Sequence, residues 1–120
     1  MNEYDLIIIG GGVSGMTAAL SAVKQNIDNI LIIEKEEILG GTLNQCIHNG
    51  FGEKILDREV TGPEYINYLE ERLAESSVEV KLNSMVLGIL DDNIVRYVSP
   101  KEGVVDVKGK AVILASGCRE

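Results

Sequence analysis

The N-terminal part of the chain alternates between apolar runs and one amphipathic stretch. Four consecutive apolar residues, Leu6–Ile9, end at a glycine, and a second run of the same kind lies within residues 29–35. Short continuous runs of this type are typical of strands buried on both faces of a parallel sheet. Residues 13–25 between them have the helical spacing of three and four, with an apolar face formed by Met16, Ala19, Leu20 and Val23. The pattern predicts a βαβ unit.

The pattern is less regular in the rest of the chain. Residues 36–60 show no period and predict a long structured loop. Residues 61–77 predict a helix, because Thr61 and Glu64 fit a capping box and Pro63 falls in the first turn. Further strands are predicted at 78–82, at 85–90, 93–98 and 104–107 as an antiparallel meander, and at 110–117 as a last buried strand. The predicted fold class is therefore α/β, with a parallel sheet, crossover helices and an inserted β-meander.

Composition and charge narrow the classes of partner. The 120 residues are 45% apolar and 25% charged, which is ordinary for a single globular domain. The net charge of −8 argues against nucleic acid and against anionic membranes, because both attract basic patches. No apolar run approaches the roughly 20 residues of a membrane span, and the first residues lack the basic region of a signal peptide. We therefore expect a cytoplasmic protein whose partner is a small-molecule substrate.

A glycine motif joins the first predicted strand to the first predicted helix. The stretch GGGVSG contains Gly10-x-Gly12-x-x-Gly15. In such a motif the first glycine permits a tight turn, the second lets a pyrophosphate approach the backbone, and the third lets the helix pack closely on the strand. The N–H groups at the helix start, which includes Val13 and Ser14, attract phosphates. The motif predicts a Rossmann-like dinucleotide site, against the alternative of a glycine-rich turn in an unrelated α/β protein.

An acidic residue follows at the distance that such a site requires. Glu34 comes 19 residues after Gly15, near the end of the second predicted strand, and Lys35 follows it. A carboxylate at this place accepts hydrogen bonds from the adenosine ribose and repels a 2′-phosphate. We therefore expect Glu34 and Lys35 to bind a dinucleotide without that phosphate. The βαβ unit alone leaves FAD and NAD both open.

Three motifs in a fixed order resemble those of a known superfamily. They are YDLIIIGGGVSGMTAALSA, the glycine pair Gly40-Gly41, and VILASGCRE near the end of the chain. Together they resemble the N-terminal part of the FAD-dependent pyridine nucleotide-disulfide oxidoreductase superfamily, whose members bind FAD and NAD(P) on two similar domains. The resemblance covers the whole chain, and it favours FAD over NAD as the ligand of these residues.

The resemblance also implies positions along the cofactor. Gly10, Gly12, Gly15 and Glu34 are expected to contact the ADP half of FAD. Gly41 and Thr42 are expected to lie along the pyrophosphate or the ribityl chain, and the segment from Val80 to Asn83 to flank the adenine. Ser116 and Gly117 are expected to pass close to the nucleotide at the end of the last strand.

Cys46 departs from the superfamily pattern. The redox pair of the disulfide reductases is Cys-x-x-x-x-Cys soon after the glycine pair, and here Leu43 stands at the place of the first cysteine. A dithiol relay needs two thiols in this segment, so we do not expect disulfide reduction. Three roles stay open for Cys46: a packing residue beside the flavin, a single catalytic thiol, or a disulfide partner of Cys118. Cys46 and His48 are too few ligands for a zinc site.

The resemblance also indicates what lies beyond these residues in the superfamily, namely a nicotinamide-binding domain. We expect residues 1–120 to be the FAD-binding domain of a longer flavoenzyme that transfers hydride through the flavin with NAD(P)H, and to be inactive alone. An unpaired sheet edge would favour self-association or a partner subunit. The alternatives are a dinucleotide-binding module without activity of its own and a plain NAD-binding domain. The latter gives no role to Gly40-Gly41 and has no meander.

Overall fold

The computed structural model describes residues 1–41 and 62–115. Within this range the strands form one six-stranded sheet in the order β3-β2-β1-β6-β5-β4. The elements are β1 (Asn2–Ile9), α1 (Val13–Lys24), β2 (Ile30–Ile33), α3 (Gly62–Ala74), β3 (Glu79–Lys81), β4 (Met85–Leu90), the short 3-10 turn η2 (Asp91–Asn93), β5 (Ile94–Ser99) and β6 (Gly103–Leu114). Strands β3, β2, β1 and β6 pair in parallel, whereas β6, β5 and β4 pair antiparallel. The predicted α/β class with a meander is confirmed.

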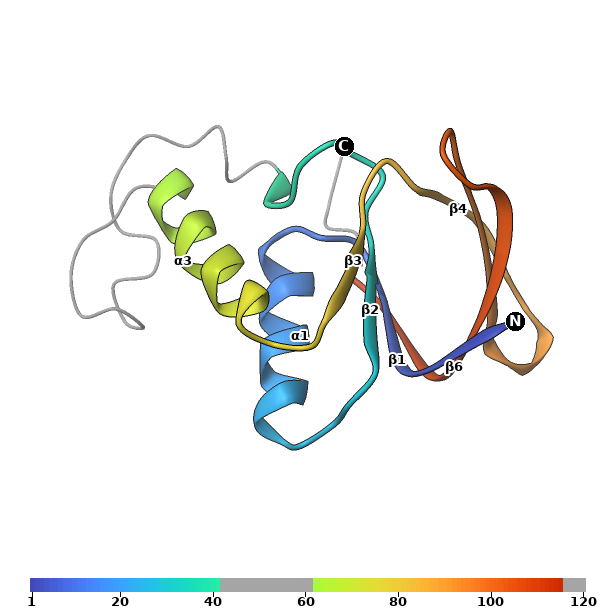
Figure 1. Cartoon of the computed structure of the whole chain (residues 1–120), viewed down its shortest axis with the longest axis horizontal. Coiled ribbons are helices and arrows are strands. Elements are labelled where there is room, and N and C mark those ends of the chain that lie inside the picture. Colours follow the sequence, from blue (N-terminus) through green and yellow to red (C-terminus); the bar gives the residue numbers. More distant parts are fainter. Residues whose placement is uncertain (42–61, 116–120) are drawn as a thin grey trace.

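The molecule has three layers, and the parallel strands form the middle one (Figure 1). Helices α1 and α3 lie on one side of β1, β2 and β3, and the antiparallel strands curve away on the other side. Neither of these two helices, which are the α-helices in the described ranges, is long and apolar enough to cross a membrane. The carboxyl ends of β1 and β2 are left at one edge of the layered structure, where ligands bind in sheets of this kind.

Strand β6 corrects the prediction of two separate strands at 104–107 and 110–117. It is continuous from Gly103 to Leu114, pairing antiparallel with β5 over its first half and parallel with β1 over its second. The expected break was wrong because Gly109 lets β6 run close beside β1. A Cβ at Gly109 would lie 2.9 Å from Cδ1 of Ile7. The meander is therefore an extension of the parallel sheet through a shared strand.

Other boundaries shift by a few residues. Strand β1 begins at Asn2, before its apolar run, because its first residues already pair with β6. Helix α3 ends at Ala74 instead of Ser77, and the Ser76 hydroxyl donates to the carbonyl of Leu73 at 2.6 Å, which closes the helix end. Thr61, the expected capping residue of this helix, lies outside the described residues.

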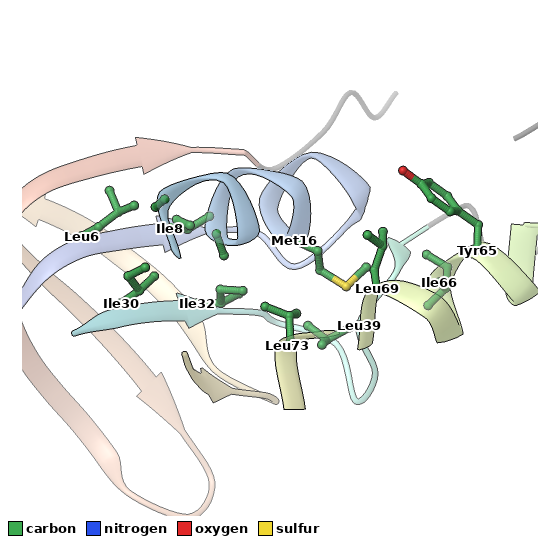
Figure 2. Packing of buried hydrophobic residues seen from close by; sticks show 12 residues of the cluster. Leu6, Ile8, Met16, Ile30, Ile32, Leu39, Tyr65, Ile66, Leu69 and Leu73 are labelled. Carbon is green, nitrogen blue, oxygen red and sulfur yellow. The ribbon is translucent and has the colours of Figure 1, made fainter. Parts of the chain in front are cut away.

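Two apolar clusters hold the layers together, one on each face of the parallel strands. The first packs β1 and β2 against both helices, and Figure 2 shows Met16 of α1 extending toward Leu69 of α3. Its buried members are Leu6, Ile8, Met16, Ala19, Ala22, Ile30, Ile32, Leu39, Tyr65, Ile66, Leu69 and Leu73. The second packs the meander against the opposite face, through Tyr4, Ile7, Leu31, Ile33, Val95, Tyr97 and Val107. Isoleucines and leucines of β1 and β2 are thus buried on both faces, as their continuous apolar runs predicted.

Candidate dinucleotide-binding site

The turn after β1 and the first turn of α1 each need a glycine for the fold itself. Gly10 has a φ of 112°, which other residues rarely adopt, and its N–H donates to the carbonyl of Ile33 at 2.8 Å. A Cβ at Gly15 would lie 1.9 Å from the carbonyl oxygen of Gly10. The turn after β1 and the close packing of α1 therefore both depend on the absence of a side chain.

Gly12 differs from these two glycines because the space beside it is open. A Cβ at Gly12 would meet no atom of the described residues within 4 Å. Gly12 is also the N-cap of α1, where no side chain caps the helix and the first turn holds no acidic residue. Val13 is half-buried and Ser14 is exposed. The first N–H groups of α1 are thus available, with the helix dipole behind them, to an anion that comes close to Gly12.

The second glycine pair lies directly against the first loop. Gly40 donates its N–H to the carbonyl of Gly11 at 2.8 Å and forms a parallel bridge with Gly12. Gly40 and Gly41 have positive φ values of 109° and 57°, and a Cβ at Gly41 would lie 3.6 Å from Cα of Gly12. Two glycine motifs that are thirty residues apart in the sequence therefore line the same open space.

Glu34 holds the first glycine loop through its carboxylate. It is only 7% exposed, and its Oε1 accepts the N–H of Gly11 at 2.5 Å while its Oε2 accepts the N–H of Glu36 at 2.9 Å. An ionised carboxylate has about four acceptor positions, so about two remain for hydroxyl donors. Glu34 can therefore order the loop and still accept hydrogen bonds from a ribose.

Sequence reasoning missed Gly11, which proves to be tightly constrained. A Cβ at Gly11 would lie 2.4 Å from Cδ2 of Leu39 and 3.1 Å from Oε1 of Glu34. Leu39 is itself buried in the first apolar cluster. The available signal was the run of three consecutive glycines, in which the middle residue is not required by the Gly-x-Gly-x-x-Gly pattern.

Lys35 and Val80 lie in different surroundings, Lys35 at the rim of an open cavity and Val80 against the apolar core. Lys35 is exposed and lines an open cavity of about 420 Å³ together with Asn83, Met85, Val98, Ser99 and Pro100. Val80 in β3 is half-buried and packs against the first apolar cluster. The contact predicted between Val80 and an adenine stays a prediction. Thr42, Cys46, Ser116 and Gly117 lie outside the described residues, so their predicted roles also stay predictions.

A polar network, here called the Glu102 network, lies between β3 and the meander. Lys81 Nζ lies 2.7 Å from Glu102 Oε2 and 3.5 Å from Glu79 Oε2. Tyr4 donates its hydroxyl to Glu79 at 2.9 Å, and Tyr97 donates its hydroxyl to Glu102 at 2.7 Å. The network thus joins β1, β3, β5 and the turn between β5 and β6 through charge-assisted hydrogen bonds.

The ionisation of these groups follows from their contacts. Burial, reinforced by the neighbouring carboxylate, raises the pKa of Tyr4 and that of Tyr97 to about 12 each. The hydrogen bond to Glu102 raises the pKa of Lys81, and the bonds from Lys81 and Tyr97 lower the pKa of Glu102. Lys81 and Glu102 therefore stay charged, and both phenols stay neutral, at any physiological pH.

Comparison with known proteins gives the site its context. A family model described as FAD dependent oxidoreductase matches residues 5–62, the range that contains both glycine motifs and Glu34. A thioredoxin reductase from Peptoclostridium acidaminophilum is 34% identical over 116 residues, which are 97% of this chain and 35% of that protein. A ferredoxin–NADP reductase from Lactiplantibacillus plantarum is 31% identical over 123 residues, covering 96% of this chain and 34% of that protein. The crystal structure of thioredoxin reductase from Streptococcus pyogenes superposes with a TM-score of 0.74 at 30% identity, covering 98% of this chain and 36% of that one.

These matches support the assignment of this chain to the FAD-dependent pyridine nucleotide-disulfide oxidoreductase superfamily. It spans about a third of the length of the curated relatives compared above. The matches also support FAD as the cofactor of the residues at this site. The plain NAD-binding alternative fails on its own two expectations, because the meander is present and Gly40 is bonded to the first glycine loop.

The residues at the carboxyl edge fit the ADP half of this cofactor. The open side of Gly12 gives a diphosphate access to backbone N–H groups, and a neutral, uncapped helix start attracts its charge. The remaining acceptor positions of Glu34 suit ribose hydroxyls. The fit rests on backbone and on one carboxylate, which is how a chain with a net charge of −8 can bind an anionic ligand.

Proposed function

We propose that this chain holds the ADP half of FAD between its two glycine motifs. The observation that carries the proposal is the hydrogen bond from Gly40 to Gly11, which places both motifs around the open side of Gly12. In this arrangement the pyrophosphate binds at the N-terminus of α1 and Glu34 accepts the ribose hydroxyls. Lys35, at the rim of the neighbouring cavity, is the exposed cation closest in sequence to Glu34 and supports the adenosine end.

The activity proposed for the longer protein is flavin-dependent oxidoreduction with NAD(P)H as the hydride partner and a small organic molecule as substrate. FAD, when bound, supplies the two-electron chemistry, whereas the residues described here bind and orient it. The name of one relative, ferredoxin–NADP reductase, supports a pyridine nucleotide as partner. We place this activity in the cytoplasm, and Cys46 stays the candidate thiol for a catalytic role near the flavin.

A binding experiment tests the proposal directly. The purified chain is incubated with FAD and desalted, its visible spectrum is recorded, and NAD is titrated in parallel by calorimetry. The proposal predicts a retained flavin band with a shifted maximum, and a weaker or absent response to NAD. Glu34→Gln, which removes the charge but keeps the shape, should lower FAD retention. NAD binding without flavin retention would contradict the proposal, and so would a chain that retains neither ligand.

We also propose that the chain self-associates through β4. This strand is one edge of the described sheet and carries four exposed apolar side chains, with exposed fractions of 55% for Met85, 53% for Leu87, 44% for Ile89 and 40% for Leu90. Unpaired strand edges with apolar side chains favour pairing with a second copy. Light scattering at increasing concentration should show a dimer for the wild type and a shift toward monomer for Leu87→Lys. A wild type that stays monomeric at every concentration would refute this.

A further inference from the structure

Strand β3 is a short edge strand whose place depends on its side chains. It has three residues and pairs, among the described strands, with β2 alone. Its middle residue, Val80, packs into the first apolar cluster, while Glu79 and Lys81 alternate to the opposite side and enter the Glu102 network. Few ladder hydrogen bonds fix so short a strand, so these side-chain contacts carry much of its positioning.

The segment that follows β3 is bonded to the backbone around Glu34. Glu34 donates its N–H to the carbonyl of Lys81 at 2.8 Å and accepts at its own carbonyl the N–H of Ser84 at 3.0 Å. Asn83 donates its N–H to the carbonyl of Glu36 at 2.9 Å. Both backbone polar groups of Glu34 are therefore held by residues 81–84, and the direction of its carboxylate depends on where that segment lies.

We propose that Glu102 acts through Lys81 as a positioning residue for Glu34, so that the β5–β6 turn sets how well the site recognises a ribose hydroxyl. Glu102 touches no ligand itself. Its carboxylate holds Lys81 at 2.7 Å, and the carbonyl of the same Lys81 holds the N–H of Glu34. The role rests on the proposed function, because it needs Glu34 to bind the ribose of the cofactor.

Glu102→Gln tests the role, and Asp106→Asn serves as its matched control. Gln keeps the length of the side chain but removes the charge that attracts Lys81. Asp106 is also a carboxylate of the β5–β6 hairpin paired with a cation, since its two oxygens accept from Arg96 at 2.8 and 3.0 Å. No described hydrogen bond links Arg96 or Asp106 to residues 34–36 or 81–84. The control therefore removes an ion pair of the hairpin without touching the Glu102–Lys81 pair, which is the one connected to Glu34.

The readout is the ratio of the affinities for ADP and for 2′-deoxyADP, measured by calorimetry on the full chain. A ribose role for Glu34 predicts that the wild type prefers ADP, because the 2′-hydroxyl donates to the carboxylate. Glu102→Gln should lower this ratio about two- to tenfold, the range of one net hydrogen bond. Asp106→Asn should keep the ratio of the wild type. In a Glu34→Gln background, Glu102→Gln should lower the ratio no further.

Each other outcome decides between the two proposals. A wild type without ADP binding overturns the proposed function, and this role with it. A wild type that prefers ADP, together with a Glu102→Gln variant of the same ratio, overturns the positioning role alone. If Glu102→Gln loses affinity for ADP and for 2′-deoxyADP equally, Glu102 only supports the fold, and the positioning role is overturned. Should Glu102→Gln fold poorly, Lys81→Met must lower the ratio and Lys81→Arg, which keeps the charge, must preserve it.

Discussion

The carboxyl edge of β1 and β2 and the Glu102 network adjoin the same residue, Glu34, but they are built in opposite ways. At the edge, other atoms approach the backbone closely because side chains are missing: the Leu39 side chain at Gly11 and the carbonyl of Gly10 at Gly15. In the network, five polar side chains from four elements reach one another across the space between β3 and the meander. The carboxyl edge is shaped by the absence of side chains, and the Glu102 network by side chains that bond to one another.

This difference separates stability from binding. At the edge, neighbouring glycines have different purposes, since Gly15 is required by the fold and Gly12 is not crowded by any described atom. A substitution at Gly12 can therefore change ligand binding alone. In the network each side chain is bonded to the next, so a substitution there changes the stability of the fold and the position of its neighbours together.

The largest effect is expected at the edge, for Gly15→Ala. Its Cβ would lie 1.9 Å from the carbonyl oxygen of Gly10, a backbone atom that cannot move aside without displacing α1 or the turn. We expect the free energy of unfolding to fall by about 3 kcal/mol or more, at or above the upper end of the usual cost of overpacking. Urea denaturation followed by circular dichroism measures this. A midpoint equal to that of the wild type would show that the glycine loop is looser than described.

The next effect is the response of the network to alkaline pH. The pKa of Tyr4 and that of Tyr97 are about 12 in the folded chain, against 10.0 for a free phenol. The unfolded chain therefore ionises first, and stability that is fully present below about pH 10 is lost as the pH rises toward 12. Near pH 11 each phenol should account for a loss of about 1.4 kcal/mol, or about 3 kcal/mol for both.

Tyr97→Phe checks which residues cause this alkaline loss. The variant should be less stable at neutral pH, but its further loss between about pH 9 and pH 11 should be about half that of the wild type. Urea midpoints at a series of pH values, together with the phenolate absorbance of the folded chain, measure both quantities. An unchanged pH slope in Tyr97→Phe would exclude a buried, carboxylate-bonded phenol at this position.

A smaller effect is expected for Tyr4→Phe at neutral pH. The substitution removes one hydrogen bond, from the hydroxyl of Tyr4 to Glu79, while Glu79 keeps Lys81 nearby. The expected cost is about 1 kcal/mol, the usual net contribution of one such bond. Thermal unfolding at neutral pH gives the value. A cost above about 3 kcal/mol would mean that the network is more cooperative than a sum of pairs.

The sequence was most informative where one physical requirement dominates. The continuous apolar runs of β1 and β2 predicted strands buried on both faces, because no other short element buries every residue. The stripe of α3 was equally clear, since Ile66, Leu69 and Leu73 repeat at helical spacing and all three are buried. The boundary within β6 was mispredicted because Gly109 is typical of a turn, and its close approach to Ile7 depends on tertiary pairing.

The site residues likewise divide into those that local sequence rules predict and those that depend on the fold. Gly10, Gly12, Gly15 and Glu34 stand at fixed spacings and could be selected from local rules alone. The contact between the two glycine motifs and the tight place of Gly11 required the fold, because they bring together residues distant in the chain. Glu102 gave no signal, since a lone charged residue in a turn usually indicates only a solvated surface.

The central claim is that the missing side chain at Gly12 serves ligand binding and is not required for folding. A comparison of Gly12→Ala with Gly88→Ala tests this claim most directly. A Cβ meets no described atom within 4 Å at either position, but Gly88 lies in β4, away from the glycine motifs. Both variants should unfold within about 1 kcal/mol of the wild type. In a fluorescence titration with FAD, Gly12→Ala should bind about five- to 150-fold more weakly, a loss of about 1–3 kcal/mol, and Gly88→Ala should bind as the wild type does. Equal FAD affinity in the two variants, with both folded, would contradict the account.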